Sequence, residues 1–112
     1  MLFKNYIPLS SAILSAEAFK EVGGIDESLS FSEDYDIFLK LSKNYNVISI
    51  NKALSIYRIH QNNMSQKNLS LGYMESIKIL KKYIKYRKIL IFSIIFNYLK
   101  YFLISIKYLF RK

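Results

Sequence analysis

The sequence predicts a small α/β domain followed by amphipathic helices. In the first 70 residues, short β-branched runs typical of strands alternate with capped helical runs, and from about Leu71 the spacing is helical to the end. The 112 residues, of which 52% are hydrophobic, suffice for one domain with a core. We therefore divide the chain into residues 1–70 and a helical tail, residues 71–112. The absence of cysteine excludes disulfides and thiolate metal sites.

The domain begins with an extended run and a short helix. Residues 7–14 (IPLSSAIL) lack helical spacing, so we expect a strand or an extended segment there. Ser15 is a favourable N-cap for a helix over residues 16–22, and Gly23 can end that helix in a left-handed conformation. Residues 24–31 have no regular period and are predicted to form a loop.

A second helix is predicted over residues 33–43, with Ser32 as its N-cap. Its apolar stripe, continued one turn towards the N-terminus, reaches Asp34, which is therefore predicted to face inwards. Asp36 instead falls on one line with Lys40, and we expect this line to be solvated and to contain one ion pair. An inward carboxylate at position 34 either accepts backbone N–H bonds at the helix end or faces a cleft.

Two strands are predicted after this helix. Residues 46–50 (NVISI) and 54–60 (LSIYRIH) are short and rich in β-branched side chains. With a period of two, Arg58 and His60 share one face and emerge side by side at the end of the second strand. The polar residues 61–70 are predicted to form a loop.

All of the excess charge lies in the last third of the chain. Residues 1–74 contain seven basic and seven acidic residues, whereas residues 75–112 contain ten basic residues and Glu75 as their one acid, which accounts for the net charge of +9. The longest uncharged run of this last third, residues 89–99, is shorter than the ~20 residues of a membrane span. The basic stripe opposite an apolar face therefore favours helices that lie on an anionic membrane surface over a merely solvated helix face. Segregation of basic and aromatic residues to opposite faces disfavours nucleic-acid binding.

Three segments of the sequence carry a resemblance to a known family. SAEAFKEVGGIDESL (residues 15–29) leads into SEDYDIFLKL (residues 32–41), and LSIYRIHQNNMS (residues 54–65) follows. In this order and spacing they resemble the family 2 glycosyltransferases of the GT-A fold, specifically the acceptor-side half of the catalytic domain, over roughly residues 7–66. The resemblance implies a partial GT-A, Rossmann-like domain. It also implies transfer of a sugar from a nucleotide-sugar donor to an acceptor hydroxyl with inversion, in cell-envelope polysaccharide or glycolipid synthesis.

The resemblance assigns roles to the acidic motif. Asp34 corresponds to the catalytic base, which removes the proton of the acceptor hydroxyl as its oxygen attacks the anomeric carbon. Glu33 corresponds to an orienting or acceptor-binding acid. The alternative for Asp34 is a carboxylate that only complements the helix dipole.

Five further residues receive roles from the resemblance. Gly23, Gly24 and Asp26 belong to an acceptor loop, while Arg58 and His60 lie near the donor diphosphate or its metal, with His60 as a candidate metal ligand. The simpler alternatives are a helix stop for the two glycines, a surface ion pair for Arg58 and a structural histidine at position 60.

The family's nucleotide-binding half, with its Asp-x-Asp motif for a divalent cation (Mg²⁺ or Mn²⁺), has no counterpart in this sequence. The triplet from Asp34 to Asp36 fits Asp-x-Asp superficially, but its acids lie on different faces of a predicted helix. We therefore expect a fragment, peripheral on the cytoplasmic face of a membrane and inactive unless a separate polypeptide supplies the donor half. The alternative is a non-catalytic membrane-surface or partner-binding module.

Overall fold

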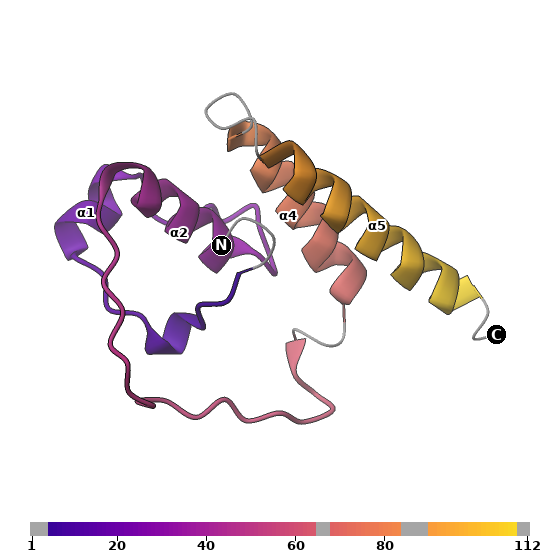
Figure 1. The fold of residues 1–112 in the computed structure, drawn as a ribbon, viewed down its shortest axis with the longest axis horizontal. Helices are drawn as coiled ribbons and strands as arrows, with labels where there is room; N and C mark the ends of the chain where they lie inside the picture. The colour runs from indigo at the N-terminus through magenta and orange to yellow at the C-terminus, as the bar shows by residue number, and fades with distance from the viewer. Residues whose placement is uncertain (1–4, 65–67, 84–89, 110–112) are drawn as a thin grey trace.

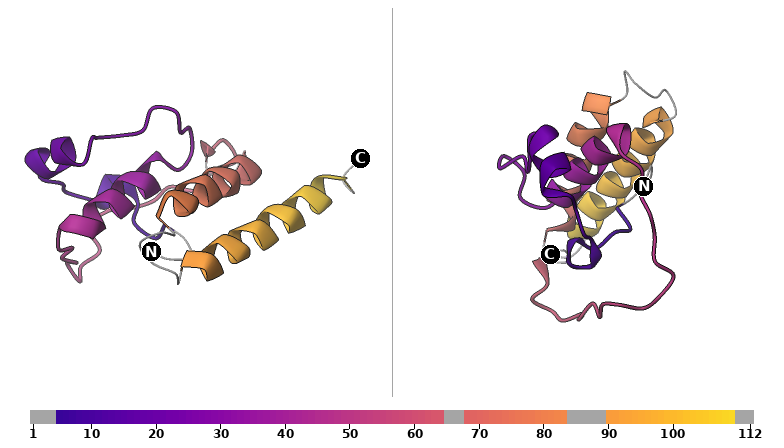
Figure 2. Two further views of the ribbon diagram at one scale, coloured as in Figure 1. Left: turned by 90° about the horizontal axis from the view of Figure 1, so that it is seen from above. Right: turned by 90° about the vertical axis from the view of Figure 1, so that its left-hand side faces the viewer.

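The computed structural model describes residues 5–64, 68–83 and 90–109. Its elements are the 3₁₀ turn η1 (Leu9–Ser11) and the helices α1 (Ala16–Glu21), α2 (Glu33–Asn44), α4 (Leu69–Tyr83) and α5 (Leu90–Leu109). Helices α4 and α5 form an antiparallel hairpin, and residues 45–64 run in a wide arc away from the helices (Figure 1). Two further views show α2 between α1 and α4 (Figure 2). This arrangement places the acidic motif at the junction of the two halves of the chain.

Local capping signals determine α1. The hydroxyl of Ser15 accepts the N–H of Ala18 at 3.3 Å, as predicted for an N-cap. Gly23 and Gly24 have φ angles of 82° and 64°, and their N–H groups donate to carbonyls of the last turn of α1 at 3.0 and 2.9 Å. These two hydrogen bonds form a Schellman motif, which requires the left-handed conformation that glycine adopts without strain. The predicted helix stop is therefore confirmed.

Helix α2 is buried on two sides. One cluster joins it to α1 and consists of the buried residues Ala18, Ile37, Phe38 and Leu41. The other joins it to α4, α5 and the preceding loop and consists of the buried residues Leu29, Tyr35, Ile77, Ile79, Leu80 and Ile94. The C-terminal helices thus share a core with the helix that carries the acidic motif, and burial of apolar surface holds the two together.

The prediction that Asp36 is solvated is wrong. Asp36 is fully buried, its carboxylate lies 2.8 Å from Lys40 Nζ, and the hydroxyl of Tyr83 on α4 donates to it at 3.4 Å. The prediction assumed one apolar stripe, but α2 packs on both sides, so the line between the two packed faces is covered as well. Lys40 also donates to the carbonyl of Gly24 at 3.0 Å, so this ion pair ties α2 to the helix stop.

The predicted strands are absent from the described residues. Residues 7–14 contain η1, and residues 46–50 and 54–60 have no regular structure. A strand needs a neighbouring backbone to complete its ladder of hydrogen bonds, and the described part of the chain supplies none. Their apolar side chains consequently remain in solvent, with Ile48 89% and Ile56 98% exposed. The described architecture is helical, and the predicted α/β, GT-A fold is not confirmed.

The helical prediction for the C-terminal third agrees with α4 and α5. Lys78, Lys81 and Lys82 of the predicted basic stripe lie exposed on α4, whereas Lys85 and Lys88 fall outside the described residues. Within the described ranges, neither hairpin helix nor any other is at once long and apolar enough to cross a membrane.

Candidate functional site

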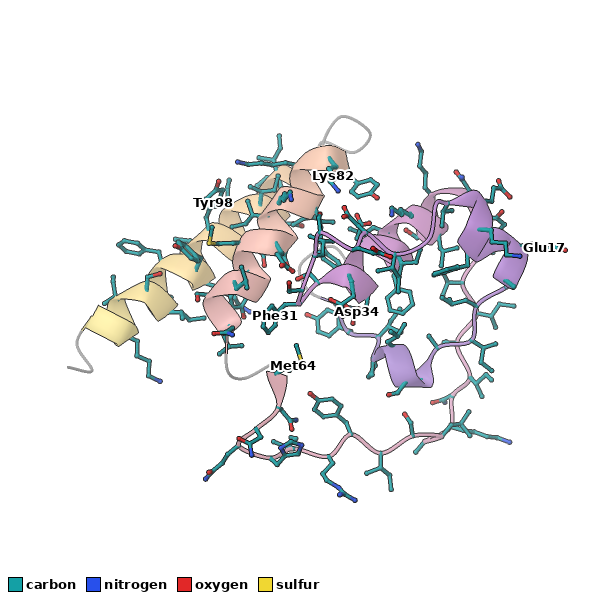
Figure 3. All side chains as sticks on the ribbon, turned by 180° about the vertical axis from the view of Figure 1, so that it is seen from behind. Glu17, Phe31, Asp34, Met64, Lys82 and Tyr98 are labelled. Carbon is teal, nitrogen blue, oxygen red and sulfur yellow. The ribbon has the colours of Figure 1, made fainter. Side chains whose placement is uncertain are left out.

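Asp34 lies in the first turn of α2, beside a cavity of about 560 Å³. The side chain is half-buried, and it lies close to Phe31 and to α4 (Figure 3). Four other parts of the chain contribute to the lining. It combines apolar side chains such as Ile7 and Leu69 with the phenol and carboxamide groups of Asn5, Tyr6, Tyr57, Asn68, Tyr73 and Asn97. Phenol and carboxamide groups both donate and accept hydrogen bonds, so this lining suits a ligand rich in hydroxyl groups.

The surroundings of Asp34 make its carboxylate more basic. Burial raises the pKa of Asp34 above its ordinary value, and the neighbouring charge of Glu33 acts in the same direction. The N–H of Tyr35 and the side chain of Asn5 favour the charged form and lower the pKa in part. A half-buried carboxylate of raised pKa beside a cavity has the properties of a general base.

Glu33 opens to a different cavity from Asp34. Consecutive residues on a helix point about 100° apart. Glu33 accordingly lines a second cavity of about 510 Å³, together with Arg58 and His60. Its Oε2 atom is buried and has no hydrogen-bond partner among the described residues. The start of α2 therefore separates two cavities, each with one carboxylate.

Arg58 and His60 share the cavity of Glu33, although the strand predicted to hold them is absent. Both side chains are exposed, and His60 Nδ1 accepts the N–H of Asn62 at 3.2 Å. In the ranges that the structure describes, no three His, Cys, Asp or Glu side chains gather so as to hold a metal ion. Among the described residues, His60 therefore has no neighbouring side chains that complete a metal site.

The predicted acceptor loop lies outside both cavities. Gly23 and Gly24 form the helix stop, and neither they nor Asp26 lines the space beside Asp34. Asp26 accepts the N–H and hydroxyl of Ser28 at 3.1 and 2.6 Å and pairs with Lys82 on α4 at 2.9 Å. These hydrogen bonds hold the pKa of the Asp26 carboxyl well below its usual range. These contacts stabilise the loop after α1, and the acceptor role of the three residues stays a prediction.

Sequence reasoning missed Glu75. This α4 residue is 8% exposed, and its carboxylate accepts the N–H groups of Ser30, Phe31 and Ser32 at 2.9, 2.9 and 3.0 Å. Ser32 stands at the N-cap of α2, but its hydroxyl donates to the carbonyl of Gly72 at 3.1 Å and makes no capping bond. The sequence feature that could have indicated Glu75 is its position as the one acid of the basic residues 75–112.

The similarity of this chain to a known protein family covers all the residues that line the two cavities. The family model described as glycosyltransferase like family 2 matches residues 1–99, which include α1, α2, α4 and the first half of α5. No curated protein and no solved structure has significant similarity to the chain. The matched range contains Asp34, Glu33 and Glu75, and it extends well beyond the segments that carry the acidic motif.

Proposed function

The chain belongs to the glycosyltransferase-like family 2, and on this basis we propose that the cavity beside Asp34 binds the acceptor of a sugar transfer and that Asp34 is the base. The observation that carries the proposal is a half-buried carboxylate of raised pKa in a cavity whose lining contains carboxamide and phenol groups beside apolar side chains. Hydroxyl groups of a sugar find both donors and acceptors in such a lining.

The proposed reaction is an inverting transfer from a nucleotide sugar. Asp34 takes the proton of an acceptor hydroxyl while the oxygen forms a bond to the anomeric carbon. The bond between that carbon and the diphosphate breaks on the opposite face, and the leaving diphosphate keeps the electron pair. Because the first turn of α2 carries Asp34, the backbone of the base is already positioned when the acceptor binds.

The cavity of Glu33 is proposed to face the donor. Its exposed Arg58 offers a guanidinium group, which pairs with phosphate oxygens in a bidentate manner. Glu33, on the wall between the two cavities, is proposed to orient the acceptor relative to the donor sugar. In this arrangement the first turn of α2 separates the proton acceptor from the leaving group.

The acceptor cavity is tested by saturation-transfer NMR on the purified chain, with methyl glycosides of glucose, galactose and N-acetylglucosamine as probes. At least one glycoside is expected to bind with a Kd on the order of 1 mM, as suits a small polar ligand. Tyr6 lines the cavity and is 70% exposed, so Tyr6→Ala should weaken binding several-fold without loss of fold.

Tyr98→Ala provides the matched control, because Tyr98 is 46% exposed and lies outside both cavities. Its binding should equal that of the wild type. Absence of saturation transfer to every glycoside, or an equal loss in both tyrosine variants, would contradict the assignment of the acceptor site.

A second candidate function rests on the outer face of α5. Eight large apolar side chains of this helix are exposed: Ile91, Phe92, Ile95, Phe96, Tyr98, Leu99, Phe102 and Leu103. An apolar face of this extent marks an interaction site rather than an ordinary protein surface. We propose that it lies in the interface of an anionic membrane, on the cytoplasmic side, where anionic lipids give the surface a negative potential.

Charge favours lipid over a protein partner at this face. Lys100 Nζ lies 4.5 Å from the ring centroid of Phe96, and Lys81 Nζ lies 5.5 Å from that of Tyr98, so cations border the apolar side chains. The single acid of residues 75–112, Glu75, is engaged by three backbone N–H groups. A second copy of this face would bring like charges together, whereas anionic headgroups would neutralise them.

Vesicle sedimentation tests the membrane proposal. Binding to vesicles that contain phosphatidylglycerol is expected to exceed binding to phosphatidylcholine alone and to fall at least tenfold in about 0.5 M salt, because each lysine contributes about 1 kcal/mol near a charged surface. The double variant Phe102→Ser/Leu103→Ser should lose most of the binding, since it removes exposed apolar area from α5.

The matched control is Ile13→Ser/Ile48→Ser, because these side chains are 96% and 89% exposed and lie outside α5. It should bind as the wild type does. Equal binding to neutral and anionic vesicles, or a dimer in analytical ultracentrifugation that only the α5 variant abolishes, would overturn the proposal.

A further inference from the structure

We propose that Glu75 is a positioning residue for Asp34: its carboxylate, carried by α4, fixes the three residues that lead into α2 and thereby sets the direction in which Asp34 points. This inference rests on the proposed function of Asp34. It adds a residue from a different helix, 41 positions further along the chain, to the machinery of the site.

Both oxygens of Glu75 are engaged. Oε1 accepts the N–H of Ser30 at 2.9 Å, while Oε2 accepts those of Phe31 and Ser32 at 2.9 and 3.0 Å. Successive N–H groups that converge in this way form a concave anion site, and here the anion is a side chain of the protein itself. The side chain is 8% exposed, so water competes little for these three hydrogen bonds.

Two further contacts bind the loop before α2 to helix α4. Two turns beyond Glu75, Lys82 pairs with Asp26 at 2.9 Å near the start of this loop. At the loop's end, the hydroxyl of Ser32 donates to the carbonyl of Gly72 at 3.1 Å. The loop is therefore fixed to one rigid helix at both of its ends, and the sequence separation of these contacts makes α4 an integral part of the site.

The contacts that hold Ser32 also determine the position of Asp34. The backbone carbonyl of Ser32 accepts the N–H of Asp36 at 3.1 Å in the first turn of α2. A shift of Ser32 therefore moves the turn that carries Asp34. Phe31 and Ser32 also line the same cavity as Asp34. Loss of the Glu75 carboxylate should consequently loosen both one wall of the cavity and the turn that carries Asp34. Water should then reach the Asp34 carboxylate, whose pKa is raised by burial.

Glu75→Gln tests this inference on the purified chain, with folding checked by circular dichroism. A carboxamide cannot accept three N–H groups, because one of its two polar atoms is itself a donor. The amides of residues 30–32 should exchange with solvent at least tenfold faster by NMR, while amides of α1 keep their protection. The pKa of Asp34, followed by ¹³C NMR, should move towards the ordinary value of a carboxyl group.

Glu17→Gln is the matched control, because Glu17 is an exposed acid on α1. It should change neither the exchange nor the titration. Glu75→Asp keeps the charge with a shorter reach and should fall between wild type and Glu75→Gln in both measurements. If Glu75→Gln does not fold, Glu75→Asp decides the question.

Two results would overturn the inference. One is unchanged exchange at residues 30–32, and the other is faster exchange with an unchanged titration of Asp34, which would leave Glu75 a purely structural residue. Both measurements are made without sugar. If no glycoside binds but the Asp34 titration responds to Glu75, the positioning role stands while the proposed function fails.

Discussion

Asp34→Asn is expected to lower sugar transfer by about 10²–10⁴-fold, the range that general-base catalysis contributes. A carboxamide has the size of the carboxylate but cannot take a proton from the acceptor hydroxyl. Nucleotide-sugar binding should be unchanged, since Asp34 does not line the cavity that faces the donor in our proposal. The same variant should be slightly more stable at neutral pH, because a buried carboxyl with a raised pKa destabilises the fold once it ionises.

The assay uses lysates of cells in which the native gene carries the substitution, supplied with radiolabelled UDP-glucose, UDP-galactose, UDP-N-acetylglucosamine or GDP-mannose. The activity of this protein is the part of the incorporation of radiolabelled sugar that is lost when the gene is deleted. Glu27→Gln is the matched control, because Glu27 is an exposed acid of the loop before α2 and lines neither cavity. Full activity in Asp34→Asn, or equal losses in the two variants, would remove Asp34 from the mechanism.

Lys40→Met is expected to destabilise the fold by about 2 kcal/mol. Removal of one partner of a buried ion pair costs about 3–5 kcal/mol, since the other charge is left unpaired in the interior. Asp36 is fully buried, but the side chain of Lys40 is 23% exposed, which reduces the expected loss. The variant also removes the donor to the Gly24 carbonyl.

Urea unfolding, followed by circular dichroism, measures this effect. The double variant Lys40→Met/Asp36→Asn should recover most of the lost stability, because it removes the unpaired charge. Lys52→Met, an exposed lysine outside the helices, should change the stability by less than about 0.5 kcal/mol. If Lys40→Met lowers the free energy of unfolding by no more than Lys52→Met does, the ion pair does not stabilise α2.

The elements that the sequence predicted correctly depend on neighbouring residues. Ser15 and Gly23 define the ends of α1 through contacts three or four positions away, and such signals are visible in the sequence. The predicted strands fail because a strand depends on a partner that local pattern does not reveal. Asp36 was misplaced for a related reason, since a second packed face of α2 comes from α4, more than 30 residues further along the chain.

The same distinction applies to the candidate site. The helical spacing that directs Asp34 inwards is local, and the structure places this side chain half-buried beside a cavity. The support that Glu75 gives to residues 30–32 spans more than 40 positions, so no local pattern could reveal it. Gly23 and Gly24 form the helix stop that their spacing predicts, and the acceptor-loop role that the resemblance implies for them stays a prediction.

The pH dependence of transfer tests the role of Asp34 most directly. A base must be deprotonated to act, so the rate should fall as the pH drops through the pKa of Asp34. Burial raises that pKa above the ordinary value of 3.8, and Asp34 is the one carboxylate among the described residues that line its cavity. We predict an acidic limb above pH 3.8 in the wild type and no such limb in the residual activity of Asp34→Asn. A wild-type rate that stays constant through the carboxyl range, or the same limb in Asp34→Asn, would contradict the assignment of Asp34 as the base.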